Sequence, residues 1–266
     1  MMRALWTAGS GMISQQLNVD VISNNLSNVN TTGYKKERVE FKDLLYETID
    51  RAYVLEDKGR PVNLQVGHGV TPIATVKSYA IGNFEKTENP LDFAIDGEGF
   101  FKIRGPKGDI QYSRDGSFKL SITDEGKKLT TSDGYAVLDE NDEDIILDGD
   151  ISRLSVTTDG ELTFTNNDGV TESTGQKLGL VKFPNKHGLE SAGDNFYSGS
   201  EVAGEAVPDE ELGKRSVIKQ YFLESSNVQV VEEMVKLIVA QRAYEVNSKA
   251  IQSADDMLGI ANNLKR

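Results

Sequence analysis

The sequence predicts an α+β protein, with long N- and C-terminal helices paired as a coiled coil and a central antiparallel all-β domain. Three observations support this: heptad spacing of apolar residues near the start of the chain, the same spacing near its end, and short alternating runs separated by Asp-Gly dipeptides between them. The predicted divisions are 1–36 and 226–266 for a terminal helical domain, 37–64 for a connecting arm and 65–225 for the β domain.

The N-terminal helix is predicted from apolar residues that alternate at spacings of three and four, with one polar break at Gln15. Thr31, Thr32 and Gly33 follow this pattern, and glycine is the usual residue just beyond a helix end. We therefore expect one helix that ends at Gly33. The seam comprises Leu5, Ala8, Met12, Gln15, Val19, Ile22, Leu26 and Val29, with Asn24, Asn25 and Asn28 near its far end.

The C-terminal helix is predicted from apolar residues seven apart, with mostly small residues at the companion positions that would let a partner helix approach closely. Ser226 and Asn227 precede it, and Glu232 and Glu233 lie in its first turns, which suits capping and the helix dipole. We expect about 35 residues, roughly 50 Å at the standard rise. The main seam is Val230, Leu237, Tyr244, Ile251 and Leu258; the companions are Ala240, Asn247, Ala254 and Ala261.

Both helices carry apolar residues beside their main seams, namely Ile13, Leu17, Val231, Val235 and Ile238. One interpretation is a helical hairpin packed on a globular body. The other is an assembly module whose second face binds other copies, and the additional apolar stripes favour it.

The middle of the chain has the pattern of antiparallel strands. Ser117–Ile122, Ile151–Thr157 and Glu161–Thr165 alternate apolar with polar residues, and Leu178–Phe183 is a more apolar run. Residues 47–63 are charged and contain Gly59 and Pro61, which indicates an arm between helix and sheet. Six Asp-Gly dipeptides predict hairpin turns, at Asp96, Asp115, Asp133, Asp148, Asp159 and Asp168.

Charge and composition exclude several classes of protein. The net charge of −13 disfavours nucleic acid and anionic lipid as partners, and the absence of cysteine excludes disulfides and thiolate sites. Neither a signal-peptide core nor a membrane-spanning apolar run is present in the sequence, so we expect no direct membrane insertion and, if the protein is exported, no cleaved signal. Residues 1–36 carry a net +2, residues 226–266 are neutral, and the segment between them carries −15. This division suits ends that pack together and a body that faces water.

No residue pattern predicts a catalytic, cofactor or metal site. The acidic residues 139–144 have Asp144 where a calcium loop needs glycine, and Gly97-Glu98-Gly99 lacks the third glycine of a phosphate loop; a solvated hairpin tip and a tight β turn explain them better. His68 and His187 have no metal-ligand spacing, and Ser10 lacks the residue on each side that a nucleophile elbow has between glycine and serine. We therefore predict a protein that is not an enzyme.

Four separated motifs resemble the axial proteins of the bacterial flagellum, the family of rod and hook subunits. They are residues 23–35 (SNNLSNVNTTGYK), residues 91–101 and 112–118 (LDFAIDGEGFF and YSRDGSF), residues 129–130 with 134–135 (LT and GY), and the stretch from Ser226 to Lys249. Residues 4–6, 40–49 and 65–70 look most like the distal-rod subunits. Ser23 and Ser27 stand where alanine is common in the family.

The resemblance implies a structural subunit of the basal-body distal rod, whose terminal helices assemble into a hollow, straight tube that transmits torque and encloses an export channel. The implied partners are copies of the same chain in a helical filament, other rod subunits, the hook and the basal-body rings. The implied location is the periplasmic rod, reached by type III export. The alternatives are a hook or proximal-rod subunit, or a soluble acidic β-domain binding module. The predicted subunit-interface residues are Leu5, Met12, Leu17, Val19, Ile22, Asn24, Asn25, Leu26, Val29, Val230, Leu237, Tyr244, Ile251 and Leu258.

Overall fold

The computed structural model describes residues 2–52, 63–123, 126–147, 149, 151–165 and 171–263. These residues form two compact units. The helical unit comprises 1–27, 37–77 and 229–266, and the β unit comprises 28–36 and 78–228. The boundary expected between residues 64 and 65 lies inside a strand of the helical unit.

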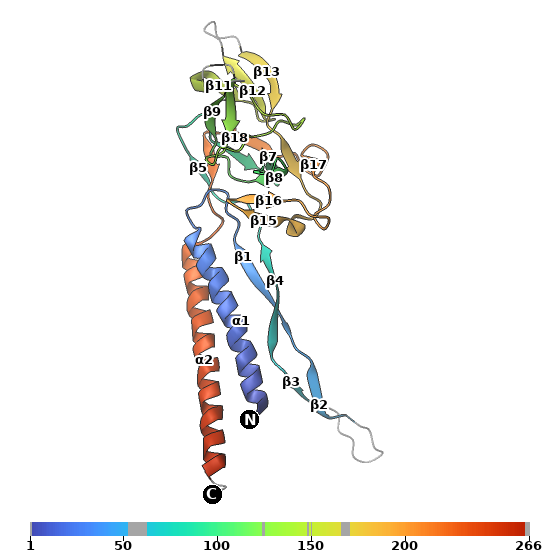
Figure 1. Ribbon diagram of the computed structural model, residues 1–266, viewed down its shortest axis with the longest axis vertical. Helices are drawn as coiled ribbons and strands as arrows, with labels where there is room; N and C mark the ends of the chain where they lie inside the picture. Colours follow the sequence, from blue (N-terminus) through green and yellow to red (C-terminus); the bar gives the residue numbers. More distant parts are fainter. Residues whose placement is uncertain are drawn as a thin grey trace. The chain divides into compact units, whose positions relative to one another are not determined.

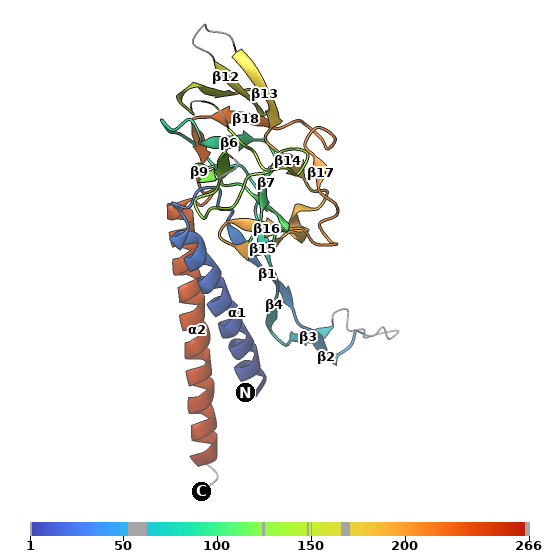
Figure 2. The same cartoon turned by 45° about the horizontal axis from the view of Figure 1, so that its top comes forward.

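Two antiparallel helices dominate the helical unit, α1 (Met2–Ser27) and α2 (Val230–Asn263), and they run side by side with the two chain ends at the same end of the pair (Figure 1, Figure 2). Helices at both ends of the chain were predicted, and this is confirmed. The 34 residues of α2 agree with the expected length, and Glu232 and Glu233 lie in its first turn, where carboxylates oppose the positive end of the helix dipole.

The predicted end of α1 at Gly33 was wrong, because the helix stops at Ser27. Asn28 starts a turn in which its backbone carbonyl accepts from Thr31 N at 3.3 Å and its side-chain oxygen accepts from the Thr31 hydroxyl at 3.1 Å. Such local bonds compete with helix continuation. Gly33 does have a positive φ of 67°, but it serves the β unit, where its N–H donates to Glu224 O at 2.7 Å.

Two successive two-stranded ribbons complete the helical unit (Figure 1). β1 (Glu37–Asp43) pairs with β4 (Val70–Lys77), and β2 (Tyr46–Asp50) pairs with β3 (Leu64–Gly67), both antiparallel. Much of the expected connecting arm is therefore an extended hairpin, while residues 53–62 of it lie outside the described residues. Gly69, at φ 110°, lies against α1, since a Cβ there would overlap the Ser10 hydroxyl.

The β unit contains a six-stranded antiparallel sheet in the order β15-β16-β8-β7-β14-β17. Its strands are β15 (Glu190–Gly193), β16 (Phe196–Ser198), β8 (Ile110–Ser113), β7 (Phe100–Arg104), β14 (Leu180–Lys182) and β17 (Val207–Pro208). Smaller antiparallel groups surround it: β18 (Val217–Gln220) with β6 (Phe93–Asp96), β19 (Phe222–Glu224) with β5 (Phe84–Lys86), β9 (Lys119–Thr123) with β10 (Gly126–Thr130), and β11 (Leu154–Val156), β12 (Glu161–Thr165) and β13 (Thr171–Lys177). The 3-10 turns are η1 (Ile151–Arg153) and η2 (Lys186–Gly188).

The β unit is held by two apolar clusters. One gathers thirteen buried residues around Phe93, Phe101 and Phe118, whose rings meet at centroid distances of 5.2 to 6.0 Å. The other surrounds Phe100, which contacts Phe183 edge-on at 6.0 Å. Aromatic pairs of this geometry add stabilisation beyond the area that they bury. The predicted mostly antiparallel β domain is confirmed.

The predicted turns are partly confirmed. Asp159-Gly160 closes the β11–β12 hairpin and Asp133-Gly134 closes a second turn, with φ of 86° and 89° at the glycines. Asp96-Gly97 and Asp115-Gly116 do not close hairpins, because each links strands of different sheets. The dipeptide at Asp168 and the aspartate at 148 lie outside the described residues.

Candidate assembly surface

Small side chains form the contact between α1 and α2. Ala240 and Ala254 are each 1% exposed, and a Cβ added to Gly11 would lie 2.8 Å from Asn247 Nδ2. Three of the four predicted companion positions, Ala240, Asn247 and Ala254, are thus buried or half-buried, whereas the fourth, Ala261, is exposed. Small residues bury little apolar area, so these positions by themselves contribute little apolar burial to the pair.

A buried polar contact closes one end of this seam. Asn25 Nδ2 donates to Glu233 Oε2 at 3.3 Å and to Glu37 O at 2.8 Å, while Asn25 Oδ1 accepts from Glu37 N at 2.9 Å. Asn25 is 1% and Glu233 2% exposed, and Lys236 Nζ lies 2.6 Å from the other Glu233 oxygen. One amide thus joins α1 to both α2 and β1.

The predicted interface residues have three kinds of environment. Within the helices, Ile22 and Asn25 are buried in the helical unit, and Val29 lies outside α1, in the β unit. The exposed ones are Asn24, Val230 and Tyr244. The half-buried ones are Leu5, Met12, Leu17, Val19, Leu26, Leu237, Ile251 and Leu258. Their role between subunits stays a prediction.

Large apolar side chains point outward from both helices. Trp6 and Ile13 of α1 are 75% and 68% exposed. On α2, Val231 and Ile238 are exposed, and so are Val235, Val239 and Val246, a set whose spacings of four and seven place them on one face. Exposed apolar surface concentrated on one element marks an interaction site. We call Val235, Val239 and Val246 the valine stripe.

Two grooves flank the helix pair. One, of about 460 Å³, is lined by Val21 and Ile22 of α1, Val239 and Ala243 of α2, and Glu37 of β1, among others. The second, of about 350 Å³, is lined by Gln16, Val19, Gln241, Tyr244 and Glu245. The first continues into the valine stripe and is mostly apolar, so it suits a packing partner better than a small polar ligand.

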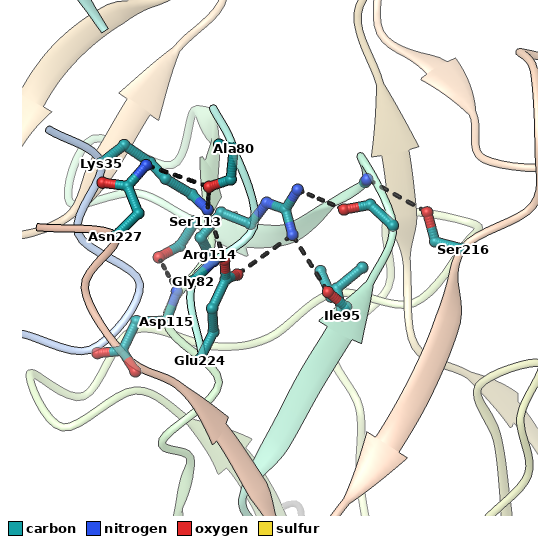
Figure 3. Close-up of polar contacts among 12 residues, drawn as sticks. Lys35, Ala80, Gly82, Ile95, Ser113, Arg114, Asp115, Ser216, Glu224 and Asn227 are labelled. Carbon is teal, nitrogen blue, oxygen red and sulfur yellow. Dashed lines mark hydrogen bonds and ion pairs between the residues drawn. The ribbon is translucent and has the colours of Figure 1, made fainter. Parts of the chain in front are cut away.

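A buried charge cluster joins four segments of the β unit, those around Lys35, Ala80, Arg114 and Glu224 (Figure 3). Lys35 Nζ lies 2.5 Å from Glu224 Oε1 and donates to Ala80 O at 2.9 Å, and Arg114 Nη1 lies 3.3 Å from Glu224 Oε2. The side chains of all three charged residues are 1% exposed. Gly82 N also donates to Glu224, at 2.8 Å. Two cations and one carboxylate are thus buried together, with backbone carbonyls accepting from both cations.

The cluster perturbs the ionisation of its members. Burial, and then the neighbouring guanidinium of Arg114, lower the pKa of Lys35 from 10.5 to about 8, against the opposing effect of Glu224. Burial likewise lowers the pKa of Arg114, while Glu224 opposes this. Arg114 keeps further partners, donating to Gly97 O at 2.6 Å and lying over the Phe100 ring at 5.3 Å.

Asn227 does not cap α2 as predicted. The helix begins three residues later, and the Asn227 side chain accepts from Lys36 N at 2.8 Å and donates to Ser78 O at 2.8 Å and to Ala80 O at 3.1 Å. The residue therefore joins the segments around Lys36 and Ser78 inside the β unit, and Figure 3 shows its contact with Ala80. Sequence reasoning missed this role and the charge cluster, although Lys35 and Asn227 both lie in the motifs that carry the family resemblance.

The residues considered above for catalysis or ligand binding make local structural contacts. Ser10 lies within α1 and donates to Thr7 O, His68 Nδ1 is 3.0 Å from Leu45 O, and His187 lies against Tyr79. The acidic residues 139–144 form a turn ion-paired with Lys102, Arg104 and Lys128. Within the described ranges, no group of three or more His, Asp or Glu is placed to hold a metal ion. Nor does any helix in the described part of the chain have the length and apolarity needed to cross a membrane.

Comparison with known proteins identifies the class to which this fold and surface belong. Residues 5–35 match the family described as "Flagella basal body rod protein", residues 94–164 match "Flagellar hook protein FlgE/F/G D1 domain", and residues 219–264 match "Flagellar basal body rod FlgEFG protein C-terminal". The chain belongs to this family of flagellar rod and hook proteins, which confirms the resemblance drawn from the motifs.

Full-length relatives narrow the position within the family. The chain is 48% identical to the flagellar basal-body rod protein FlgG of Borreliella burgdorferi over 100% of both chains. It is 41% identical to FlgG of Buchnera aphidicola from Schizaphis graminum (97% of this chain, 98% of the relative) and 37% identical to FlgG of Bacillus subtilis over 100% of both. It is 31% identical, again over 100% of both, to the flagellar hook-basal body complex protein FlhP of Bacillus subtilis.

Proposed function

We propose that this chain is a structural subunit of the flagellar basal-body distal rod, and not an enzyme, which self-assembles through its terminal helices into a hollow, straight helical tube. The observation that carries the proposal is that small residues and large apolar residues lie on different faces of the two helices. Small residues close the α1–α2 pair, while Trp6, Ile13 and the valine stripe face outward. A monomer gains nothing from such a surface, whereas an assembly buries it.

The physics of assembly follows from that surface. Each apolar side chain removed from water on contact with a neighbour contributes roughly 25 cal/mol per Å². The outward residues of α1 and α2 lie on different faces from the seam between them, so one subunit can contact neighbours on more than one side. Contacts between unlike faces that do not close into a ring extend into a filament, which is the arrangement proposed for this chain.

The helix pair is the proposed coiled-coil element of this assembly. Buried α2 residues Glu233, Ala240 and Ala254, with half-buried Asn247 between the last two, recur every seven positions, which is the period of a helix that supercoils around a partner. The half-buried predicted residues, such as Leu5, Met12 and Leu237, lie at the margin of this pair. We propose that they contact neighbouring subunits, as the interface assignment made from sequence expects.

Location and partners follow from the same proposal. The rod subunit would reach the periplasmic part of the basal body by type III export without a cleaved signal, enclose the export channel and transmit torque. Its partners would be copies of itself, other rod subunits, the hook and the basal-body rings. Full-length similarity to proteins named as basal-body rod proteins supports the basal-body assignment.

A hook or a different rod subunit is the alternative within the family, because the chain also matches the family described for hook protein. Electron microscopy of the concentrated full chain separates the two. Straight hollow tubes support the distal rod. Curved tubes would favour the hook assignment and contradict ours.

A further inference from the structure

None of the fully buried residues on the face that α2 presents to α1 is a large apolar one. Glu233, Ala240 and Ala254 are buried there, Leu237, Asn247, Ile251 and Leu258 are half-buried, and Val235, Val239 and Val246 are 56%, 62% and 65% exposed. At 3.6 residues per turn the valine stripe lies about a third of a turn from the seam. Both faces of α2 thus carry apolar side chains, so apolar burial alone does not select the observed face over one rotated toward the valines.

A polar contact opposes that rotation. Asn25 and Glu233 are buried against each other, and the Asn25 amide also exchanges two hydrogen bonds with the backbone of Glu37, at 2.8 and 2.9 Å. Rotation of α2 would carry the Glu233 carboxylate away from this amide. The Asn25 amide, which is 1% exposed, would lose one acceptor, and an unmatched donor is costly where water is excluded.

We propose that Asn25 and Glu233 are positioning residues that fix which face of α2 meets α1 and so keep the valine stripe outward. A single buried asparagine that selects one arrangement of apolar helices over others is a known use of polar core residues. The claim that the valine stripe is an assembly surface rests on the proposed function. The claim that Asn25 and Glu233 select the face of α2 that meets α1 does not. The close contact of Gly11 with Asn247 provides a place to measure that choice.

Disulfide formation between introduced cysteines reports the face directly, because the natural sequence contains no cysteine. A Cβ at position 11 lies 3.3 Å from Asn247 Cγ, so Gly11→Cys with Asn247→Cys reports the observed arrangement. Gly11→Cys with Val246→Cys, one residue earlier on α2, reports the rotated arrangement. Both pairs are oxidised in dilute full-length monomer, and the rates of the intramolecular bond are compared.

In the natural background the 11–247 pair should form much faster than the 11–246 pair. Asn25→Leu with Glu233→Leu should lower this ratio of rates by about tenfold or more, the equivalent of about 1.4 kcal/mol. Asn25→Asp should shift it in the same direction, since it removes the amide donor and places two carboxylates together. Glu233→Gln keeps an acceptor for Asn25 and should leave the ratio close to its natural value.

Ser23→Leu with Glu232→Leu is the matched control, because it adds the same two leucines at exposed positions on the same helices. It should leave the ratio unchanged. An unchanged ratio in both Asn25 variants would overturn the proposal. Loss of both disulfides together with the helical circular dichroism signal would also overturn it. That result would mean that the polar pair is needed for the helices to pair at all and does not select a face. The disulfides are measured in monomer, whether or not tubes form. Failure of this proposal can therefore be distinguished from failure of the proposed assembly function.

Discussion

Glu224 accepts a hydrogen bond from Lys35 across 189 residues of sequence, in a site where both side chains are 1% exposed. The same carboxylate contacts Arg114 through its second oxygen, so one negative charge serves two buried cations. An incomplete set of buried charges is far more destabilising than a complete one. The stability of the β unit should therefore depend sharply on which member is removed.

Glu224→Gln should destabilise the β unit more than Lys35→Met. The first leaves two buried cations without a counter-charge and should cost roughly 3–5 kcal/mol. The second leaves Glu224 with Arg114 and Gly82 N, and should cost about 1–3 kcal/mol. Denaturant unfolding of both full-length variants measures the difference, and equal costs would contradict the assignment of Glu224 as the shared partner.

Lys35 should make stability rise with pH in the alkaline range. Between about pH 8 and 10.5 the unfolded chain keeps the Lys35 proton while the folded chain releases it. The unfolded state then binds more protons, so the free energy of unfolding rises, by at most about 1.4 kcal/mol per pH unit. Lys35→Met removes this contribution, and the stability of the natural chain relative to this variant should increase from pH 8 to 10. A constant difference would show that Lys35 keeps its ordinary pKa.

Gly11 should tolerate no large side chain, unlike Gly9 on the same helix. A Cβ at Gly9 has no atom within 4 Å, so Gly9→Leu should stabilise α1 by about 0.5–1 kcal/mol through helix propensity. Gly11→Leu must displace Asn247 and should destabilise the helix pair by about 1–3 kcal/mol. Thermal loss of the helical circular dichroism signal compares them. The same gain in both variants would contradict the tight seam.

Gly33 should be more sensitive to substitution than Gly134. Both have positive φ, 67° and 89°, so alanine is strained at either position by about 1 kcal/mol. At Gly33 the added Cβ would also lie 2.7 Å from the carbonyl carbon of Arg114, whereas at Gly134 the space is open. Gly33→Ala should therefore lower the unfolding midpoint well below that of Gly134→Ala. Similar midpoints would show that the backbone near Arg114 yields easily.

The parts of the fold that were predictable from sequence are those with a local cause. The terminal helices follow from seven-residue spacing, and the Asp159-Gly160 hairpin follows from its own turn residues. The end of α1 was not predictable from sequence. Gly33 has the positive φ that is typical of a glycine just beyond a helix end, but here its N–H donates to Glu224 O in the β unit.

The candidate site was predictable in outline and not in detail. The seven-residue spacing of the larger apolar residues predicted Val230 and Tyr244 on the main seam of α2. In the structure these two residues are exposed, and Ala240 and Ala254 are buried. A contact between Asn25 and Glu233 joins residues 208 positions apart. No local spacing carries such information, and the charge cluster around Glu224 was unpredictable for the same reason.

The most direct test of the central claim is sedimentation velocity and electron microscopy of the full chain with Val235, Val239 and Val246 each changed to Thr. The changes keep side-chain shape, remove apolar surface from the exposed face of α2 and leave the seam intact. The control changes Ile81, Ile122 and Val202, exposed residues of the β unit, to Thr. We expect tubes from the natural chain and the control, and monomer from the valine variant. Tubes of the same length and number from the valine variant would contradict assembly through the outward face of α2.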